Sequence, residues 1–481
     1  MHNQFIFLFI LFFVGEWYKI NGKESWVEYI LDSDSSESSE EYLKKDSNPS
    51  IWAVLVAGSN DWYNYRHQAD VLHAYHVLKK HGIKEDNIIT MVYDDIAHNK
   101  LNPYPGKIYN VPHGINVYEG VKIDYKGDAV TPENFLAVLE GDRNKVKGGN
   151  GRVVESTKED KIFVFFSDHG AVGMVSFPTS ILTVKDLNEV LNKMHNNKRY
   201  KELTFYLEAC ESGSMFEGIL SKNINVYAIT AANSHESSWG CFCDNDMKLP
   251  CLGDTFSVSW ILNSEAANLN TETLNKQYEI VKKLTNMSHV MHYGDLKIAK
   301  EYVSEFQGHD SISYPLINRF YQERNYPLKY RFYREKQFEN MILNSVMEDS
   351  RDIPLIMIEK EYHESISTEN EKKAEQRYLK AIHKREYLKK FITKMVKYFV
   401  KDHETRHNVL KKLQRNGVGN VECHHEIVHF FHNNCFNFNR NAYAMKYVYV
   451  LSNLCDLGIE IETLKSGLFN VCQNNRITNI I

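Results

Sequence analysis

The sequence predicts an α/β fold, in which a mostly parallel sheet is flanked by helices, followed by an all-helical C-terminal segment. Two observations carry this prediction. Between residues 51 and 310, short apolar runs alternate with amphipathic stretches of helical spacing, as expected of buried parallel strands joined by crossover helices. Residues 372–413 are instead dense in Lys, Glu and Leu, and the segment that follows them also has a helical pattern.

The first strand of the sheet is predicted at residues 51–57, a continuous apolar run that ends at Gly58. A helix should follow it, because Val71, Leu72, Tyr75 and Leu78 recur at helical spacing. Gly82 stands where a helix C-cap is expected. Residues 88–93 form a second apolar run of strand length. The sheet therefore begins as a strand, a helix and a second strand.

The alternation continues to the end of this region. Thr131 and Pro132 are a typical N-cap and first helical residue, ahead of an apolar stripe. Further strands are predicted at 162–166, 203–207 and 225–230, and further helices at 184–194 and from 255 to 262. In open parallel sheets, functional residues gather just past the carboxyl ends of the strands, so those strand ends are where we look for a site.

The N-terminus predicts entry into the secretory pathway. Residues 5–14 are an unbroken apolar run, too short for a membrane span of roughly 20 residues but as long as a signal-peptide core. Residues 23–48 are acidic and serine-rich, which is typical of a disordered or removable pro-segment. No second long apolar run follows, so we expect no membrane contact. The net charge of -5 gives no support to a nucleic-acid partner.

The cysteines suit an oxidising compartment. Of the eight, Cys210 stands apart inside an apolar run, and Cys241, Cys243 and Cys251 form a middle group. The sequence leaves the pairing of these three open; one arrangement joins Cys243 to Cys251 and leaves Cys241 unpaired. The remaining four lie near the C-terminus: Cys423, Cys435, Cys455 and Cys472. Their connectivity is left open by the sequence, which allows three arrangements. Asn286 begins the one proline-free Asn-x-Ser/Thr sequon and is the predicted glycosylation site.

Two predicted strands end in reactive residues. The run at 162–166 leads into Asp168, His169 and Gly170, and the run at 203–207 leads into Glu208 and Cys210. If the strands are neighbours, His169 and Cys210 share one edge of the sheet. A thiol beside an imidazole can perform nucleophilic catalysis, because the thiolate attacks and the imidazole transfers protons. The N–H groups of Gly170 and Cys210 could stabilise the oxyanion, by about 3 kcal/mol per donor.

A structural role is the alternative for each residue taken singly, since a lone Cys in an apolar strand usually fills core space and a lone His is usually structural. His169 and Cys210 stand at the ends of successive strands, and each is followed by Gly within three residues. This combination favours catalysis. Asp168 is either an exposed turn residue that modulates His169 or simply a strand-end turn residue.

At this point the sequence resembles a known family. Residues 51 to about 310 are similar to the catalytic domain of legumains, or asparaginyl endopeptidases, which share the caspase-like fold. The motifs that carry the resemblance are residues 57–60, 63–70, 93–95, 167–170, 208–215 and 230–233. The resemblance implies Cys210 as nucleophile, His169 as general acid/base and Asn64 as the residue that orients the imidazole. It also implies a substrate pocket made by Arg66, His67, Glu208, Ser237, Ser238 and Asp254.

This pocket suits an asparagine side chain, which offers one acceptor and two donors to the donors Arg66 and His67 and the acceptors Glu208 and Asp254. An aspartate substrate would meet like charge, so cleavage after Asp should require acid. The resemblance therefore implies an endopeptidase that cuts protein and peptide substrates after Asn, and after Asp at lower pH. It implies no cofactor and no metal.

Residues 366–481 resemble the legumain prodomain, a helical bundle that covers the active site as an intramolecular inhibitor. The implied disulfides are Cys423–Cys455 and Cys435–Cys472. We expect its basic residues to dock on Glu208, Glu211 and Asp254, and acid to release it. The cut that activates the zymogen should follow Asn340, Asn344 or Asn370. Cystatin-type inhibitors are a further expected partner, and a lysosomal, endosomal or other acidic lumen is the expected location.

The predicted domain organisation is a signal peptide at 1–20, an acidic pro-segment at 21–50, a catalytic domain at 51–310, a linker at 311–365 and a helical prodomain at 366–481.

Several alternative functions fit parts of the sequence. A peptide ligase would use the same acyl-enzyme at Cys210. A GPI-anchor transamidase is disfavoured by the lack of a C-terminal spanning helix, a caspase by the signal peptide, and a binding protein without catalysis by the presence of Asn64, His169 and Cys210. His425 and His429 match a zinc-peptidase motif with Glu426 between them, but they lie between two cysteines of the bundle, so polar helix positions are the favoured interpretation.

Overall fold

The computed structural model describes residues 49–309, 336–364, 368–411, 413, 415–473 and 477–481, and the backbone of 18–20 and 23–25. The chain divides into two units, Met1–Asn48 and Pro49–Ile481. In the first unit, β1 (Tyr18–Ile20) and β2 (Lys23–Ser25) pair antiparallel. The predicted signal-peptide core and most of the acidic segment lie outside the described residues, as does 310–335. All other elements belong to the second unit.

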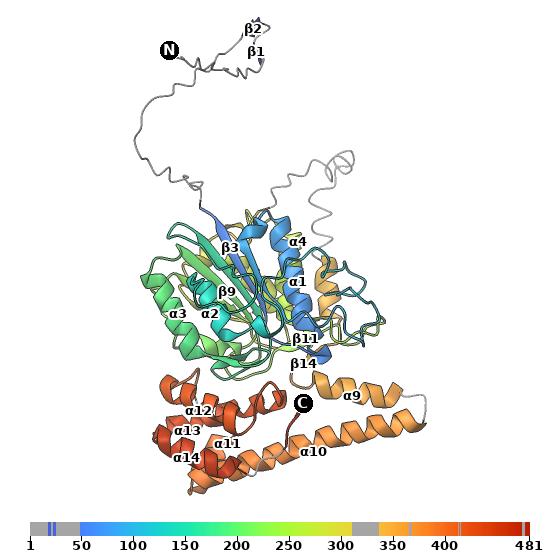
Figure 1. Cartoon of the computed structure of the whole chain (residues 1–481), viewed down its shortest axis with the longest axis vertical. Coiled ribbons are helices and arrows are strands. Elements are labelled where there is room, and N and C mark those ends of the chain that lie inside the picture. The colour runs from blue at the N-terminus through green and yellow to red at the C-terminus, as the bar shows by residue number, and fades with distance from the viewer. Residues whose placement is uncertain are drawn as a thin grey trace, which may run out of the picture. The chain divides into compact units, whose positions relative to one another are not determined.

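A six-stranded sheet forms the centre of the second unit (Figure 1). Its order is β13-β10-β9-β5-β3-β4, and β13 is the antiparallel edge of an otherwise parallel sheet. The strands are β3 (Ile51–Ala57), β4 (Ile88–Met91), β5 (Lys161–Ser167), β9 (Glu202–Glu208), β10 (Val226–Thr230) and β13 (Met291–Gly294). The predicted strands all appear, and β13 was not predicted.

Helices cover both faces of the sheet because successive strand residues point to opposite sides. The even-numbered residues of β3 and β5, such as Val54 and Val164, face a core shared with two helices, and the odd-numbered residues, such as Leu55 and Phe165, face a core shared with three others. The first group is α2 (Pro132–Glu140) and α3 (Val184–Asn196); the second is α1 (Tyr65–Lys80), α4 (Thr255–Ala266) and α5 (Leu274–Leu284).

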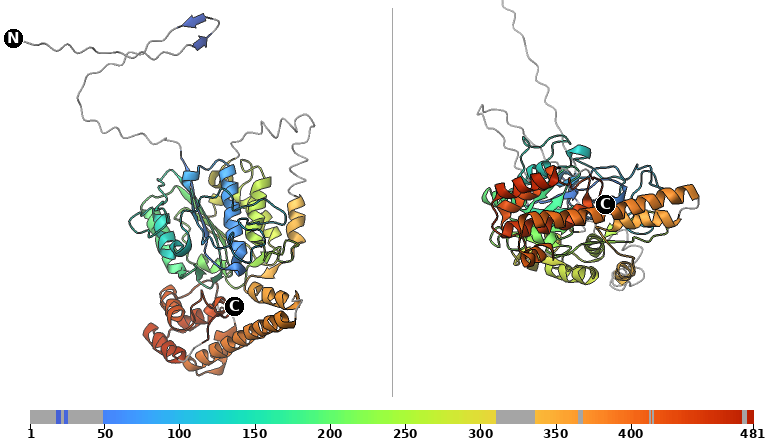
Figure 2. Two further views of the ribbon diagram at one scale, coloured as in Figure 1. Left: turned by 45° about the vertical axis from the view of Figure 1, so that its right-hand side comes forward. Right: turned by 90° about the horizontal axis from the view of Figure 1, so that it is seen from below.

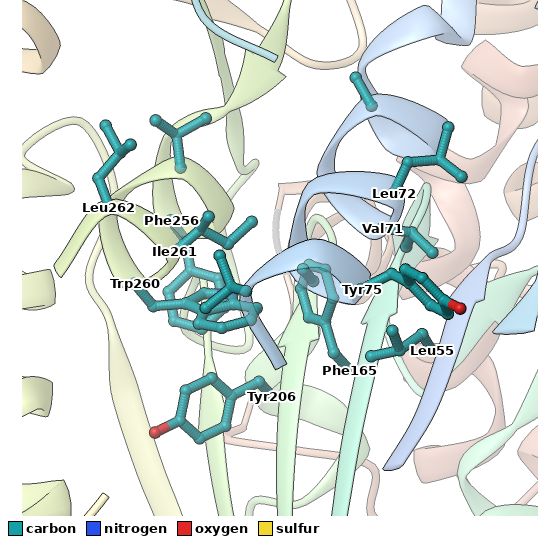
Figure 3. Close-up of a cluster of buried hydrophobic side chains, with 14 of the residues drawn as sticks. Leu55, Val71, Leu72, Tyr75, Phe165, Tyr206, Phe256, Trp260, Ile261 and Leu262 are labelled. Atoms are coloured by element: carbon teal, nitrogen blue, oxygen red, sulfur yellow. The ribbon is translucent and has the colours of Figure 1, made fainter. Parts of the chain in front are cut away.

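Aromatic packing fixes the second of these cores (Figure 3). The Trp260 ring lies edge-on to Phe163, Phe165 and Tyr206, with centroid distances of 5.6, 5.0 and 5.6 Å. Such edge-to-face pairs contribute about 0.5–1.5 kcal/mol beyond burial. Leu72 and Tyr75 of α1 pack in the same core, so α1 and α4 are held against strands whose ends carry the candidate site.

The predicted helix at residue 131 begins as expected. The Thr131 side chain accepts a hydrogen bond from the Asn134 N–H, Pro132 follows at the first turn, and Gly141 closes the helix at φ 73°. Three short strands form a separate small sheet: β6 (Gly170–Ala171), β7 (Met174–Ser176) and β8 (Ile181–Thr183). The remaining short elements are α6 (Ser304–Gln307), η1 (Trp62–Asn64), η2 (Glu85–Asn87), η3 (Gly127–Ala129), η4 (Ser212–Met215), η5 (Ile298–Lys300) and η7 (Ala442–Tyr447).

The C-terminal segment is all-helical, as predicted (Figure 2). Its helices are α9 (Ile353–Glu364), α10 (Thr368–Phe399), α11 (His403–Lys411), α12 (Val421–Asn434), α13 (Val448–Asp456) and α14 (Ile461–Cys472). The helices α10 to α14 share a core that also takes in Ala171, Met174 and Ile181 of the small sheet, whereas Ile353 of α9 packs with Cys243 and Cys251. The predicted fold class is therefore confirmed. Among the helices of the described residues, none combines the length and the apolar character needed to cross a membrane.

Candidate active site

The candidate catalytic residues lie at the carboxyl edge of the sheet. Ser167 of β5 pairs with Glu208 of β9, so His169 and Cys210 each follow this pair by two residues. The contact between the two segments continues past the strands, because the Asp168 N–H donates to the Glu208 carbonyl at 3.1 Å and a Cβ placed on Gly170 would clash with the Cys210 carbonyl oxygen. The structure thus brings the imidazole and the thiol to the same edge of the sheet, called the rim below. Residue 170 must be glycine because the two backbones touch there.

The hydrogen bonds of Asn64 determine how the His169 ring is oriented. Asn64 Nδ2 donates to the Asn60 carbonyl at 2.8 Å, which leaves its Oδ1 to accept from His169 Nε2 at 2.8 Å. Nε2 therefore carries the imidazole proton, and Nδ1 carries the lone pair. Burial, together with the nearby Arg66 and Arg351 guanidinium groups, holds the pKa of His169 well below its ordinary value. The ring is neutral and able to accept a proton.

Cys210 is buried, and its sulfur accepts a hydrogen bond from the Ser238 N–H at 3.3 Å. Burial raises the pKa of the Cys210 thiol to about 12, although Arg351 opposes this shift. A nucleophilic cysteine must become a thiolate. The described form therefore keeps the sulfur protonated and unreactive.

Beside this pair is a fully buried polar pocket. Arg66 Nε lies 2.9 Å from Asp254 Oδ1, and His67 Nε2 lies 3.5 Å from Asp254 Oδ2. Glu208 Oε2 accepts from both the N–H and the hydroxyl of Ser257, each at 3.0 Å. Burial raises the pKa of Glu208, and it also raises that of Asp254 against the opposing effect of Arg66.

Three atoms of this pocket have no hydrogen-bond partner among the described residues: Arg66 Nη2, Glu208 Oε1 and Asp254 Oδ2. Buried polar atoms are normally paired, and each unpaired one costs about 1–3 kcal/mol. One donor and two acceptors match the one acceptor and two donors of a carboxamide. The pocket is therefore chemically complementary to an Asn side chain.

Two serines were also expected in the pocket. Ser238 is buried and contacts both the Cys210 sulfur and, at 3.3 Å, the Ser350 hydroxyl. Ser237 precedes it in the loop and is only partly exposed. Asp168 is not the exposed turn residue that the sequence suggested. It is buried, with Oδ1 3.4 Å from His67 Nδ1, because the pocket residues of α1 cover the end of β5.

Several residues of the site were not predicted. Asp70 accepts from the Asp254 N–H at 3.2 Å and from Asn110 Nδ2 at 2.7 Å, so a third carboxyl lies behind the pocket. Its position four residues after Arg66, on the same face of a predicted helix, was a usable signal. Ser59 was also missed; its hydroxyl lies 2.6 Å from His67 Nδ1.

A second omission is the segment around residue 350, which the sequence placed in a linker. It forms β14 (Glu348–Asp349), which pairs antiparallel with β11 (Trp239–Cys241), whose other neighbour is β12 (Gly253–Asp254). The Ser350 N–H donates to the Ser238 carbonyl at 3.1 Å, and the Ser350 hydroxyl lies 3.4 Å from Asp254 Oδ1. Arg351 Nη2 donates to the Gly170 carbonyl at 2.9 Å and pairs with Glu211. The segment thus crosses the site as an added strand.

The helical bundle contacts the catalytic domain mainly elsewhere than predicted, although its Lys446 lies close enough to Glu211 to lower the pKa of that carboxyl. Its His424 Nε2 lies 2.8 Å from the Val172 carbonyl, and its Glu422 lies 2.8 Å from Lys185. The expected docking of basic bundle residues on Glu208 and Asp254 is wrong, because Ser257 and Arg66 already pair with these carboxyls inside the catalytic domain. Glu211 is paired with Arg351, which precedes the bundle helices.

The cysteine pairs in the structure are Cys243–Cys251, Cys423–Cys455 and Cys435–Cys472, the last two being those that the resemblance implied. Cys210 and Cys241 are free and buried. Asn286 is exposed just after α5, and the Ser288 hydroxyl donates to the Ala231 carbonyl at 2.7 Å. Of the three candidate activation sites, Asn340 and Asn370 lie in helices and Asn344 in an exposed turn before β14.

Comparison with known proteins shows which family this chain resembles. Residues 51–309 match the Peptidase C13 family, and residues 376–472 match the legumain prodomain. The chain is 39% identical to the vacuolar-processing enzyme delta-isozyme of Arabidopsis thaliana over 465 residues, which cover 93% of this chain and 95% of that protein. It is 41% identical to the legumain of Rattus norvegicus and 39% identical to that of Homo sapiens, with 88% of this chain and 92% of each relative covered.

Proposed function

Because this chain belongs to the peptidase C13 family of legumain-type cysteine endopeptidases, we propose that it cleaves peptide bonds after asparagine and is made as a self-inhibited, acid-activated zymogen. The observation that carries the specificity is the set of three unpaired atoms in the pocket, Arg66 Nη2, Glu208 Oε1 and Asp254 Oδ2. An Asn amide oxygen would accept from Arg66, and its two N–H groups would donate to Glu208 and Asp254.

The chemistry follows from the rim geometry. His169 Nδ1 takes the proton of the Cys210 thiol as the sulfur attacks the carbonyl carbon of the scissile bond. The N–H groups of Gly170 and Cys210 stabilise the oxyanion. The imidazolium then returns its proton to the departing amine, which leaves a thioester at Cys210. A water molecule, deprotonated by His169, hydrolyses the thioester to release the acid product and restore the thiol.

The substrate preference and its pH dependence test this proposal. Among peptides that differ at a single residue, those cut after Asn should be far better substrates than those presenting Arg or Leu. Cleavage after Asp should rise relative to Asn as pH falls. Burial raises the pKa of Glu208, so acid protonates this carboxyl more readily and removes its repulsion of the Asp carboxylate. The ratio of kcat/KM values across pH measures this, and a ratio that does not change with pH contradicts the pocket assignment.

Self-inhibition is proposed from the segment that carries Ser350. Its backbone pairs with β11, as an extended substrate would, and the Ser350 hydroxyl lies 3.4 Å from Asp254 Oδ1. Serine has no amide to satisfy the three unpaired atoms, so the segment occupies the site without being a good substrate.

Ser350→Asn should convert this segment into a substrate. With an amide in the pocket, we expect a cut between positions 350 and 351, detected by mass spectrometry, where the unmodified chain gives none. The same substitution combined with Cys210→Ala provides the control and should remain intact. Cleavage confined to other positions in Ser350→Asn would contradict the placement of this segment.

Acid should favour release of the segment, because release changes the pKa of His169. Burial, Arg66 and the segment's own Arg351 depress the pKa of His169 in the closed form, and the contribution of Arg351 is lost on release. The closed form is therefore fully favoured above the ordinary imidazole pKa of about 6.5 and loses stability as pH falls below it. Burial raises the pKa of Glu211 to about 7 and Arg351 opposes this shift, so losing Arg351 on release favours protonation of Glu211 and acts in the same direction.

Hydrogen–deuterium exchange of residues 345–352 measures this release. After correction for the intrinsic pH dependence of exchange, protection of the segment should fall between pH 7 and pH 5. In Arg351→Gln, protection should already be lower at pH 7, and its change with pH should be smaller. Equal protection at both pH values in the unmodified chain would contradict acid release.

The location and partners are part of the same proposal. Three disulfides and the exposed sequon at Asn286 support passage through the secretory pathway, and acid activation supports an acidic lumen as the working compartment. The bundle lies in the same chain as the peptidase, and cystatin-type inhibitors, implied by the resemblance, stay an expected class of partner.

A further inference from the structure

Two histidines of the bundle and one aspartate of the catalytic domain meet outside the active site. His425 and His429 lie one turn apart on α12, and Asp186 lies in the first turn of α3. Each offers a ligand atom, and these atoms all lie within 4.8 Å of one another. We propose that Asp186, His425 and His429 form a binding site for a divalent cation of the Zn²⁺ class, and that the bound ion holds the bundle on the catalytic domain.

The geometry is close to what such an ion requires. A tetrahedral zinc with bonds of 2.0–2.1 Å separates its ligand atoms by about 3.3 Å. His425 Nδ1 already lies 3.5 Å from Asp186 Oδ2, and the two imidazole centroids are 4.7 Å apart. Small side-chain rotations are enough to complete the set. Two imidazoles and a carboxylate are a donor set that suits zinc.

The ligands are held by neighbouring groups. The Thr183 hydroxyl donates to Asp186 Oδ2 at 2.6 Å and also lies 2.8 Å from His425 Nδ1. The contact between His424 and the Val172 carbonyl fixes α12 against the catalytic domain. The Thr183 contacts involve the proposed ligand atoms themselves, so a bound ion would replace the proton that His425 Nδ1 presents to Thr183. The side chains of His425 and Asp186 are 20% and 30% exposed, which leaves an entry path and room for water as a fourth ligand.

The arrangement differs from a zinc-peptidase centre. Glu426, the residue that would act as general base in that motif, pairs instead with Lys465 of α14 at 2.9 Å, and the third ligand comes from another domain. The sequence alone favoured polar helix positions for His425 and His429, because it could not show that Asp186 faces them. The site is therefore one for binding and not for catalysis.

The consequence is a link between metal binding and domain association. An ion whose ligands come from both domains binds the closed form and not the separated one. The population of the separated form should then fall by the factor 1 + [ion]/Kd, about 100-fold at 100 times Kd. This inference does not depend on the substrate specificity proposed above.

Zinc binding to the full-length chain tests the proposal. We would use tag-free Cys210→Ala protein, which cannot process itself and lacks the active-site thiol as a competing ligand. Equilibrium dialysis against ZnCl₂ at neutral pH, with zinc counted by mass spectrometry, should give one more bound ion than in Asp186→Asn or His429→Ala made in the same background. Calorimetry should show a zinc-dependent rise in Tm that both variants lose.

His113→Ala is the matched control. His113 Nε2 lies 2.9 Å from Asp246 on an exposed surface, which gives a similar His–Asp pair that belongs to no three-ligand group within the described part of the chain. This variant should keep both the extra zinc and the rise in Tm. Zinc-free Tm values show whether each variant folds. If Asp186→Asn folds and binds as much zinc as its parent, or if zinc leaves the parent's Tm unchanged, the proposal is overturned.

Discussion

Cys210→Ala is expected to lower the kcat/KM of the processed peptidase on an Asn peptide by about 10⁴-fold or more, the loss typical of removing a catalytic nucleophile. At acidic pH the variant should also remain full length, because it cannot cut itself. The physical reason is that the attacking atom is gone while its surroundings are kept. His169 keeps its bond to Asn64, and the pocket keeps its contacts between Arg66 and Asp254.

Cys241→Ala is the matched control for this experiment. Six of the eight cysteines are paired, and Cys241 is the other free one; like Cys210 it is buried, and burial raises its pKa as well. Cys241 is the last residue of β11 and lies near the carboxyls of Asp70, Asp254 and Glu208, but unlike Cys210 it does not follow a strand of the central sheet. Its loss should therefore leave kcat/KM within a few-fold. The kcat/KM of both variants is measured after the same active peptidase has processed them in trans. Self-processing by Cys210→Ala, or an inert Cys241→Ala, would contradict the assignment.

The meeting of His169 and Cys210 at one edge of the sheet could be predicted because two simple rules apply to the same residues. Buried parallel strands are continuous apolar runs, so β5 and β9 are visible in the sequence, and the polar residues directly after them mark where each strand ends. Parallel strands end at the same edge of a sheet, which brings His169 and Cys210 together without knowledge of any tertiary contact. The start of α2 was predictable for a similar reason, because capping at Thr131 is local chemistry.

The remaining parts of the site depend on contacts that have no local signature. β14 pairs with β11 through backbone groups, which any residue supplies, and the charged, tyrosine-rich stretch before it has no periodicity. The docking of the bundle was wrongly predicted because charge complementarity ignores prior partners. Glu208 and Asp254 look like available acids in the sequence, but Ser257 and Arg66 bind them. Asp168 looks like an exposed turn residue because nothing nearby in sequence reveals that His67 covers it.

Arg66→Met should destabilise the protein at neutral pH more than other single changes in the pocket. The Arg66 side chain is fully buried and donates to Asp254 and to the Tyr63 carbonyl. It lies among buried carboxyls, and it lowers the pKa values of Asp168 and Asp254 against the effect of their burial. Removing one partner of a buried ion pair leaves an uncompensated charge, which costs about 3–5 kcal/mol.

The pH dependence of this loss identifies its cause. Without Arg66, the pKa values of Asp168 and Asp254 rise further in the folded state, so the folded protein binds more protons than the unfolded chain, and its stability falls as pH rises. The deficit of Arg66→Met in Tm or in unfolding midpoint should therefore be large at pH 7 and smaller at pH 5, measured in the Cys210→Ala background. A deficit that is equal at both values would indicate lost packing instead of an unpaired charge.

Arg66→Lys separates the charge from the geometry. An ammonium keeps the positive charge near Asp254 but cannot present the guanidinium fork, in which Nε binds Asp254 while Nη2 remains for a substrate. We therefore expect Arg66→Lys to recover most of the lost stability but little of the kcat/KM on Asn peptides. If Lys restored cleavage after Asn as well as stability, Arg66 Nη2 would not be the donor that recognises the substrate amide, and the pocket would select its substrate by charge alone.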